Sequence, residues 1–240
     1  MLPGPNSGSV TGMATSSETR AVLFDIDGTL IDSNYLHVES WSRAFDDIGV
    51  PVDAWRVHRG IGLDSGKLLE ELLGERADEL GDAAKERHSV RYEPLVPRLR
   101  RFDGARELIA RLSDAGVRVV LATSAPPEEF EALSECLDAD EWLHAATTAD
   151  DVETAKPEPD IIAAALDRAG VPAARAVMIG DTRWDAIAAG RAGVRSVGVL
   201  SGGVGAGELR EAGASVVFDD VAAILAAVDS SGTDALFTDD

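Results

Sequence analysis

The sequence predicts an α/β protein with a doubly wound, parallel-sheet (Rossmann-like) core and a small inserted α-helical cap domain. Three observations support this prediction. Short apolar runs recur along the chain, helical patterns alternate with them, and one long stretch near the N-terminal end has helical spacing but no convincing strand. Such alternation is typical of parallel strands joined by right-handed helical crossovers.

The predicted strands are continuous apolar runs, which suit strands buried on both faces of a sheet. They are Ala21–Ile26, Val117–Ala122, Ala174–Ile179, Arg195–Leu200 and Ala214–Phe218, with Trp142–Thr147 as a weaker candidate. The predicted helices between them are Gly104–Ala115, Glu128–Cys136, Pro159–Ala169, Trp184–Ala192 and Glu208–Ala212. Several of these helical patterns end at a glycine, such as Gly116 and Gly170, and glycine is the preferred residue just after a helix.

Residues 33–100 interrupt this alternation. Helical spacing lies there in Leu36–Gly49, Leu63–Leu73 and Ala77–Leu95. We therefore expect a helical cap at 33–100, inserted into an α/β core that comprises 20–32 and 101–228. The hinges are expected near Ile31–Ser33 and Arg100–Asp103.

The two ends of the chain are predicted to lie outside the core. Residues 1–19 are rich in Gly, Ser, Thr and Pro, so we expect a disordered tail, with either Met1 or Met13 as the true start. Residues 229–240 are expected to form an acidic tail. The start lacks the pattern of a secretory signal, and no run reaches the roughly 18 apolar residues of a membrane span. Together with a single cysteine, Cys136, this predicts a cytoplasmic protein.

The chain has 43 acidic and 22 basic residues, which gives a formal net charge of −21. This acidity argues against binding nucleic acid or an anionic membrane surface, since both require a basic face on the protein. Lysine is rare: only Lys67, Lys85 and Lys156 occur in the chain. The acidity also poses a problem for phosphorylated metabolites, which a protein of this charge should repel.

Polar residues follow the predicted strands at the edge where ligands bind in sheets of this kind. They are Asp25 and Asp27 after the first strand, Thr123 and Ser124 after the second, Lys156 before the helix that leads to the fourth, and Asp181 and Asp185 after the fourth. Two carboxylates about 4 Å apart repel each other by about 4 kcal/mol at an effective dielectric constant near 20, so a cation is expected between them. Oxygen ligands without His or Cys indicate a hard ion, with Mg²⁺ as the default.

Four segments carry a family resemblance. They are Phe24-Asp-Ile-Asp-Gly-Thr-Leu-Ile-Asp-Ser33, Leu121-Ala-Thr-Ser-Ala125, Ala155-Lys-Pro-Glu-Pro-Asp160 and Gly180-Asp-Thr-Arg-Trp-Asp185. In this order they resemble the four signature motifs of the haloacid dehalogenase superfamily, and the resemblance spans about residues 20–220. The chain is most similar to the branch of phosphoglycolate phosphatase and β-phosphoglucomutase, which inserts a helical cap after the first motif.

The resemblance implies a Mg²⁺-dependent phosphomonoester hydrolase that acts on a small phosphorylated metabolite through an aspartyl-phosphate. Asp25 is the expected nucleophile. Asp27 is the expected acid and base, which protonates the leaving alcohol and then deprotonates water. Thr123 and Ser124 would bind the transferring phosphoryl group, and Lys156 would neutralise both the phosphate and the nucleophile.

The expected metal ligands are the Asp25 carboxylate, the Asp27 main-chain carbonyl and the Asp181 carboxylate, with Asp185 in a supporting position. In the cap, His37 and Arg59 are expected to contact the substrate. The roles of Lys67 and His88, as possible contacts to substrate phosphate or hydroxyl groups, are left open. The stretch Gly202-Gly-Val-Gly-Ala-Gly207 is interpreted as a surface loop and not as a dinucleotide-binding loop.

Other functions stay open at this level. A sugar phosphomutase of the same family is the first alternative, although our alignment places Ser65 where the mutase pattern has an arginine. A non-enzymatic phospho-aspartate switch or interaction protein is the second. A dehalogenase is disfavoured, because it needs no metal and would not be expected to keep both Asp27 and Asp181. The substrate, and whether the chain is a monomer or a homodimer, are left open.

Overall fold

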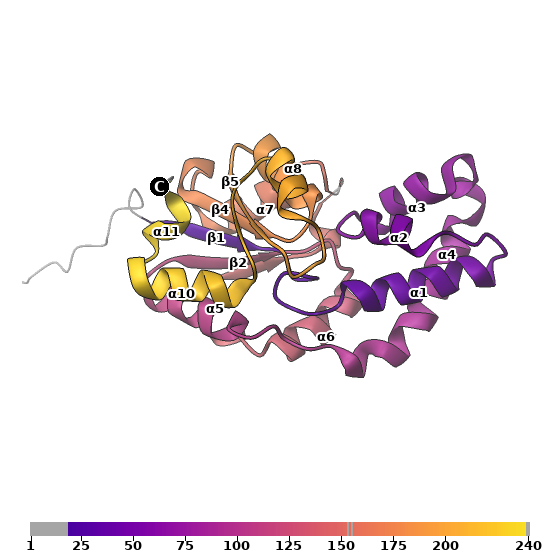
Figure 1. Cartoon of the computed structure of the whole chain (residues 1–240), viewed down its shortest axis with the longest axis horizontal. Helices are drawn as coiled ribbons and strands as arrows, with labels where there is room; N and C mark the ends of the chain where they lie inside the picture. Colours follow the sequence, from indigo (N-terminus) through magenta and orange to yellow (C-terminus); the bar gives the residue numbers. More distant parts are fainter. Residues whose placement is uncertain (1–18, 153, 155, 239–240) are drawn as a thin grey trace, which may run out of the picture.

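The computed structural model describes residues 19–152, 154 and 156–238, which contain a six-stranded parallel sheet with helices on both of its faces (Figure 1). The strand order is β3-β2-β1-β4-β5-β6. The strands are β1 Ala21–Phe24, β2 Arg118–Ala122, β3 Ala145–Thr147, β4 Ala176–Gly180, β5 Arg195–Val199 and β6 Ala214–Phe218. The predicted fold class is therefore confirmed. The predictions of a disordered tail and of the true start concern residues 1–18, which lie outside the described residues.

Strand β1 lies in the middle of the sheet because both of its faces are apolar. Val22 and Phe24 belong to the hydrophobic cluster on one face, and Ala21 and Leu23 belong to the cluster on the other. All four residues are fully buried. This alternation follows from the pleat of a strand, in which successive side chains point to opposite faces.

Each face of the sheet is covered by its own helices. The first cluster takes apolar residues from α5 Ala105–Asp114, α6 Pro127–Leu137 and α10 Val221–Ser231, and the second from α7 Asp160–Ala169 and α8 Arg183–Arg191. A short helix, α9 Ala206–Glu211, stands between β5 and β6. None of the helices in the described part of the chain is long and apolar enough to cross a membrane.

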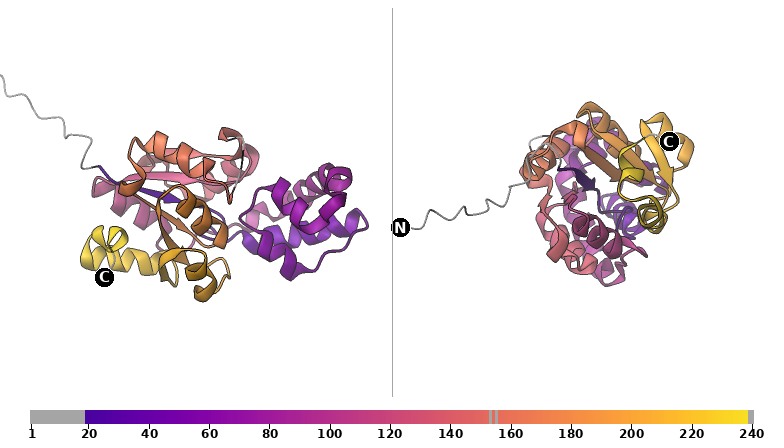
Figure 2. Two further views of the ribbon diagram at one scale, coloured as in Figure 1. Left: turned by 90° about the horizontal axis from the view of Figure 1, so that it is seen from above. Right: turned by 90° about the vertical axis from the view of Figure 1, so that its left-hand side faces the viewer.

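The cap consists of four helices that lie together at one end of the molecule (Figures 1 and 2). They are α1 Asn34–Asp47, α2 Ala54–Gly60, α3 Ser65–Leu73 and α4 Ala77–Tyr92. They pack around a separate hydrophobic cluster that includes Trp41, Phe45 and Leu69. The sequence patterns locate α1, α3 and α4 but not α2.

Two segments connect the cap to the sheet, and they run side by side. The Asp32 N–H donates to the Arg100 carbonyl oxygen at 2.8 Å, and the Phe102 N–H donates to the Leu30 carbonyl oxygen at 3.0 Å. These paired segments coincide with the positions at which the hinges are predicted. The limits of cap and core as separate domains stay a prediction.

The prediction of an acidic tail at 229–240 is wrong for its described part. Helix α10 extends to Ser231, and a further helix, α11 Asp234–Phe237, packs back against the core with Leu236 fully buried. The Arg20 guanidinium pairs with Asp234 at 2.5 Å. The apolar residues of the segment outweigh its acidic composition, because burying Leu236 stabilises the fold while the carboxylate finds a cationic partner.

Candidate active site

The site forms at the carboxyl end of β1. Strand β1 lies between β2 and β4, so the strand order reverses there: β2 and β3 follow on one side of β1, and β4, β5 and β6 on the other. Doubly wound sheets bind ligands at such a point. Asp25 follows β1 directly, and its N–H still donates to the Ile179 carbonyl oxygen at 2.9 Å. The strand is shorter than predicted because the chain turns at Ile26, whose carbonyl oxygen accepts from the N–H groups of Leu30 and Ile31.

Lys156 joins two of the predicted carboxylates. Its Nζ lies 2.6 Å from Asp25 Oδ1 and 2.7 Å from Asp185 Oδ1. The Lys156 side chain has no exposed surface. Burial alone would lower the pKa of Lys156, but the charges of Asp185 and Asp25 outweigh it and raise the pKa above its ordinary value. The lysine is therefore a fixed positive charge beside Asp25.

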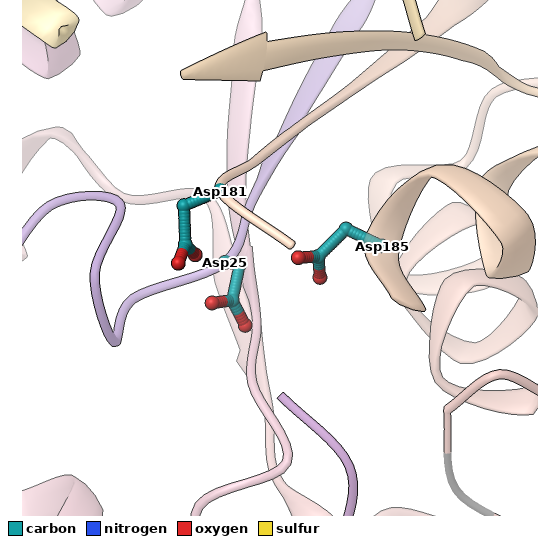
Figure 3. A group of neighbouring side chains, drawn as sticks. All are labelled: Asp25, Asp181 and Asp185. Atoms are coloured by element: carbon teal, nitrogen blue, oxygen red, sulfur yellow. The ribbon is translucent and has the colours of Figure 1, made fainter. Parts of the chain in front are cut away.

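Three buried carboxylates point toward one another at this edge of the sheet (Figure 3). Asp25, Asp181 and Asp185 each place a carboxylate oxygen within 4.8 Å of the other two. Burial and the charge of Asp185 raise the pKa of Asp181 to about 7. Burial also raises the pKa of Asp25; Lys156 opposes this increase, whereas Asp185 and Asp181 add to it. The repulsion indicates that a further cation would stabilise the group.

The surroundings of Asp181 hold its carboxylate in place. Thr29 Oγ1 donates to Asp181 Oδ1 at 2.9 Å, and Asn34 Nδ2 donates to Asp181 Oδ2 at 2.8 Å. A Cβ atom at Gly202 would lie 1.6 Å from Asp181 Oδ2, so only glycine leaves room for it there. The interpretation of 202–207 as a surface loop is therefore wrong at Gly202, which is buried because the loop folds over Asp181.

These residues fit a Mg²⁺ ion, because they offer hard carboxylate oxygens that are held in a fixed arrangement. Asp185 is fixed separately: its Oδ2 accepts from the Thr182 N–H at 3.1 Å and from Thr182 Oγ1 at 2.6 Å. Thr182 and Asp185 thereby form a capping box at the start of α8. Asp185 has both a structural role in this helix and a position at the carboxylate cluster.

The Asp27 carboxylate takes no part in this cluster but points toward the start of the cap. Ser33 Oγ donates to Asp27 Oδ1 at 2.5 Å, and His37 Nε2 lies 3.4 Å from the same oxygen. Burial would raise the pKa of Asp27, but the hydrogen bonds from His37 and Ser33 lower it below its ordinary value. Coordination of a metal by the Asp27 main-chain carbonyl stays a prediction.

A cavity of about 620 Å³ lies between the edge of the sheet and the cap. The predicted residues Asp25, Asp27, Thr123, Ser124, His37, Lys67 and His88 all contribute to its lining, and so does Lys85. Two of the chain's three lysines therefore line the cavity, and the third stands beside Asp25. The structure thus gathers seven of the predicted residues around one half-open cavity, while Lys156, Asp181 and Asp185 lie beside Asp25 without lining it.

The two hydroxyl residues after β2 are placed to donate hydrogen bonds into this cavity. Thr123 Oγ1 accepts from the Ala125 N–H at 3.0 Å, which leaves its own proton available to a ligand. The buried Ser124 Oγ has no hydrogen-bond partner within the described part of the chain. A buried hydroxyl without a partner is costly, so a ligand oxygen at this position would stabilise it.

Arg59 does not reach the cavity, and its predicted contact with the substrate is not supported. Its guanidinium pairs with Glu208 Oε1 at 2.8 Å on the outer side of the molecule. Arg59 instead lines a smaller hollow of about 80 Å³ beside α9. The physical reason is its partner: the ion pair with Glu208 holds the Arg59 guanidinium beside α9.

Several residues that hold the site together were not among the predicted ones. They are Thr29, Ser33, Asn34 and Gly202, while Glu129 is an unpredicted residue of the cavity lining. Thr29 and Ser33 lie inside the first motif, so the motif itself indicates that they belong to the site. Asn34 and Gly202 meet Asp181 only through the tertiary fold.

Comparison with known proteins agrees with this geometry. Residues 19–193 match the family model of haloacid dehalogenase-like hydrolases. The chain is 32% identical over 186 residues to the validoxylamine A 7'-phosphate phosphatase of Streptomyces hygroscopicus subsp. limoneus, which covers 76% of this chain and 86% of that protein. It is also 32% identical over 217 residues to a phosphoglycolate phosphatase of Rhodospirillum rubrum, which covers 85% of this chain and 89% of the relative.

A solved structure shows the same arrangement. The crystal structure of a hydrolase from Pseudomonas syringae superimposes with a TM-score of 0.83 at 35% sequence identity. The match covers 89% of this chain and all of the other. The similarity therefore includes the cap as well as the sheet.

Proposed function

The chain belongs to the haloacid dehalogenase-like hydrolase family, and from that premise we propose that it is a Mg²⁺-dependent phosphatase of a small phosphorylated metabolite. The observation that supports this most strongly is the position of Asp25. Its carboxylate lies at the tip of the central strand, faces the cavity and contacts the buried ammonium of Lys156 at 2.6 Å. This is the environment that a nucleophile needs in order to attack a phosphate ester.

In the first step, an oxygen of Asp25 forms a bond to phosphorus while the bond between phosphorus and the ester oxygen breaks. Asp27 donates a proton to the departing ester oxygen, so that an alcohol leaves and an aspartyl-phosphate remains. The negative charge of the arriving phosphate favours the protonated form of Asp27. Asp25 and Asp27 both line the cavity, so one substrate can contact both of them.

In the second step, Asp27 removes a proton from a water molecule whose oxygen attacks the phosphorus. The bond between phosphorus and Asp25 breaks, inorganic phosphate forms, and the Asp25 carboxylate is restored. Splitting hydrolysis in this way replaces one difficult displacement by two easier ones. Asp27 therefore serves as acid and then as base, and its carboxylate must stay in the same position through both steps.

The transferring phosphoryl group carries negative charge on its oxygens, and preorganised donors stabilise it. Thr123 and Ser124 are placed to donate hydrogen bonds to these oxygens. Lys156 holds Asp25 in position and supplies a buried positive charge beside the nucleophile in a chain of net charge −21. Because its ammonium is fully buried, little solvent screens this charge.

Asp25, Asp181 and the main-chain carbonyl of Asp27 would hold the Mg²⁺ ion, with Asp185 in support. When bound, the ion supplies positive charge that offsets both the carboxylates and the phosphate. The protein's own contribution is to fix these oxygens through Thr29, Asn34 and Thr182.

A sugar phosphomutase is disfavoured by the lining of the cavity. Ser65 lines it where the mutase pattern has an arginine, and no arginine contributes to the lining among the described residues. A non-enzymatic phospho-aspartate switch has no evident use for a cavity of about 620 Å³ beside the aspartate. Hydrolysis of a small substrate uses the cavity and needs no arginine in its lining.

The proposal is tested with purified protein, Mg²⁺ and a panel of phosphorylated metabolites, including phosphoglycolate and sugar phosphates. We expect release of inorganic phosphate from at least one of them, and from an aryl phosphate. Product analysis with a hexose 1-phosphate separates a phosphatase from a mutase, because a mutase returns the phosphoryl group to sugar. Lack of phosphate release from every compound would contradict the proposal.

A further inference from the structure

Four polar side chains form a line of contacts that begins at Asp27, passes through two cap histidines and ends at Glu129 on α6. His37 Nε2 lies 3.4 Å from Asp27 Oδ1, and His37 Nδ1 lies 3.2 Å from His88 Nε2. His88 Nδ1 in turn lies 3.8 Å from Glu129 Oε1. The functions assigned above to the site use Asp27 but give no role to His88 or Glu129.

The line crosses between the two parts of the molecule twice. Asp27 and Glu129 belong to the sheet side, in the loop after β1 and in α6, whereas His37 and His88 belong to cap helices α1 and α4. All of these residues line the same cavity. Moving the cap away from the sheet would therefore break the contact at each end of the line at once.

The two imidazole rings are held firmly by aromatic neighbours. His37 and His88 are 8% and 5% exposed. The ring of Tyr92 stacks on His37 with centroids 4.2 Å apart, and the ring of Trp41 stacks on His88 at the same separation. Stacking fixes the planes of the rings but does not decide which nitrogen carries a proton.

The neighbouring Glu129 favours one position for the proton on the His88 ring. Burial and the neighbouring His37 lower the pKa of His88 to about 2, so its ring is neutral and carries a single N–H. The carboxylate of Glu129 lies 3.8 Å from Nδ1, which is longer than a hydrogen bond, and its negative charge favours the tautomer with the proton on Nδ1 by electrostatic attraction. His88 Nε2 is then an acceptor, and His37 Nδ1 must be the donor to it. His37 Nε2 faces the Asp27 carboxylate at 3.4 Å and can donate to it only when protonated, so the ring that joins His88 to Asp27 carries a proton on each nitrogen.

We propose that His88 and Glu129 are positioning residues for Asp27, which act by holding the His37 ring in the orientation that contacts the Asp27 carboxylate when the cap lies over the sheet. The inference rests on the proposed function, because it assigns Asp27 the proton transfer to the leaving group. It predicts that changes at His88 or Glu129, which do not touch the reacting atoms, weaken the step that needs this proton.

Two nearly isosteric substrates measure that step. Phenyl phosphate has a poor leaving group that needs protonation, whereas p-nitrophenyl phosphate has an acidic leaving group that departs without it. With both, kcat/KM reports formation of the aspartyl-phosphate alone. The ratio of the two kcat/KM values therefore isolates proton donation by Asp27, and losses of cavity shape or stability cancel from it because the substrates are so alike.

The variants are Glu129→Gln, His88→Leu and His88→Gln. Glu131→Gln is the matched control for the first, since Glu131 lies on α6 but is exposed and outside the cavity. We expect Glu129→Gln and His88→Leu to raise the ratio of kcat/KM for p-nitrophenyl phosphate to kcat/KM for phenyl phosphate by about tenfold. This is smaller than the rate loss that removal of a general acid itself causes. Glu131→Gln should leave the ratio unchanged. His88→Gln keeps a hydrogen-bond donor and an acceptor, so the ratio in this variant should rise less than in His88→Leu.

The outcomes separate the two proposals. Wild-type protein that hydrolyses neither substrate would contradict the proposed function. Wild-type activity with the same ratio in Glu129→Gln and His88→Leu as in the control would overturn the positioning role. If His88→Leu shows no cooperative thermal unfolding, the test relies on Glu129→Gln and His88→Gln. An unchanged ratio in Glu129→Gln alone is sufficient to refute the positioning role.

Discussion

Asp25 Oδ1 and Lys156 Nζ are 2.6 Å apart in an environment that excludes water from the lysine entirely. The same ammonium contacts Asp185 at 2.7 Å, so one lysine serves two carboxylates. The buried lysine supplies positive charge at the nucleophile proposed for phosphate esters. Lys67 and Lys85 add positive charge in the cavity, whose lining also carries six acidic residues.

Replacement of Lys156 by methionine should reduce both activity and stability. The Lys156→Met variant leaves Asp25 and Asp185 without their buried partner, and breaking a buried pair typically costs about 3–5 kcal/mol. We expect this loss in urea unfolding without Mg²⁺, together with a strong loss of phosphatase activity. Adding Asp185→Asn should cost less than the sum of the single changes, because the two groups interact. Additive losses would contradict the pairing.

Mg²⁺ should raise the thermal unfolding temperature of the wild-type protein, and Asp181→Asn should abolish the increase. A ligand at 100 times its Kd stabilises the folded state by about 2.7 kcal/mol. The matched variant is Asp27→Asn, whose side chain contacts Ser33 and His37 instead of the carboxylate cluster. It should lose activity but keep the shift. Equal shifts in Asp181→Asn and wild type would argue against the proposed site.

Gly202→Ala should lower the affinity for Mg²⁺ without unfolding the protein. The added Cβ would meet Asp181 Oδ2 at 1.6 Å, so the carboxylate has to move. Because disturbing the support of a ligand commonly costs about 10–100-fold in metal affinity, half-maximal activity should require at least about tenfold more Mg²⁺. The control is Gly207→Ala, where nothing lies within 4 Å of the added atom. Identical Mg²⁺ titrations of the two variants would contradict the prediction.

Arg59→Gln should leave kcat/KM unchanged, whereas Lys67→Met should raise KM. Arg59 makes an exposed pair with Glu208, and such pairs contribute about 0–1 kcal/mol to stability. Lys67 lines the cavity and can contact a bound anion. A change in KM with constant kcat indicates a loss of binding that ground state and transition state share. Steady-state kinetics with the best substrate of the panel provides the measurement, and a larger effect at Arg59 would reverse the assignment.

The part of the site that the sequence predicts is the part that a parallel sheet brings together. Asp25, Thr123 and Asp181 each follow an apolar run, and the carboxyl ends of parallel strands meet at one edge. Their proximity therefore needs no knowledge of tertiary packing. Strand alternation also predicts that Asp27 points to the same side as Asp25, and both line the cavity. Its contacts with Ser33 and His37 depend on the turn that follows the end of β1 at Phe24.

The missing part depends on contacts between distant segments. Asn34 meets Asp181 across 147 positions of sequence, and no local pattern indicates that pair. Arg59 pairs with Glu208 across 149 positions of sequence, and no local pattern indicates that contact either. Helix α10 is different: Asp220 caps it and Val221, Ile224 and Val228 repeat at helical spacing, so the sequence itself carries its signal.

The most direct test of the proposed function is whether phosphate becomes attached to Asp25. Wild-type protein and Asp25→Asn are mixed with a substrate labelled in its phosphoryl group in the presence of Mg²⁺, and the reaction is stopped with acid within the first turnover. We expect label bound covalently to the wild-type protein and none on Asp25→Asn, which should also release no phosphate. Undiminished phosphate release by Asp25→Asn, or label attached to it, would contradict the proposed function.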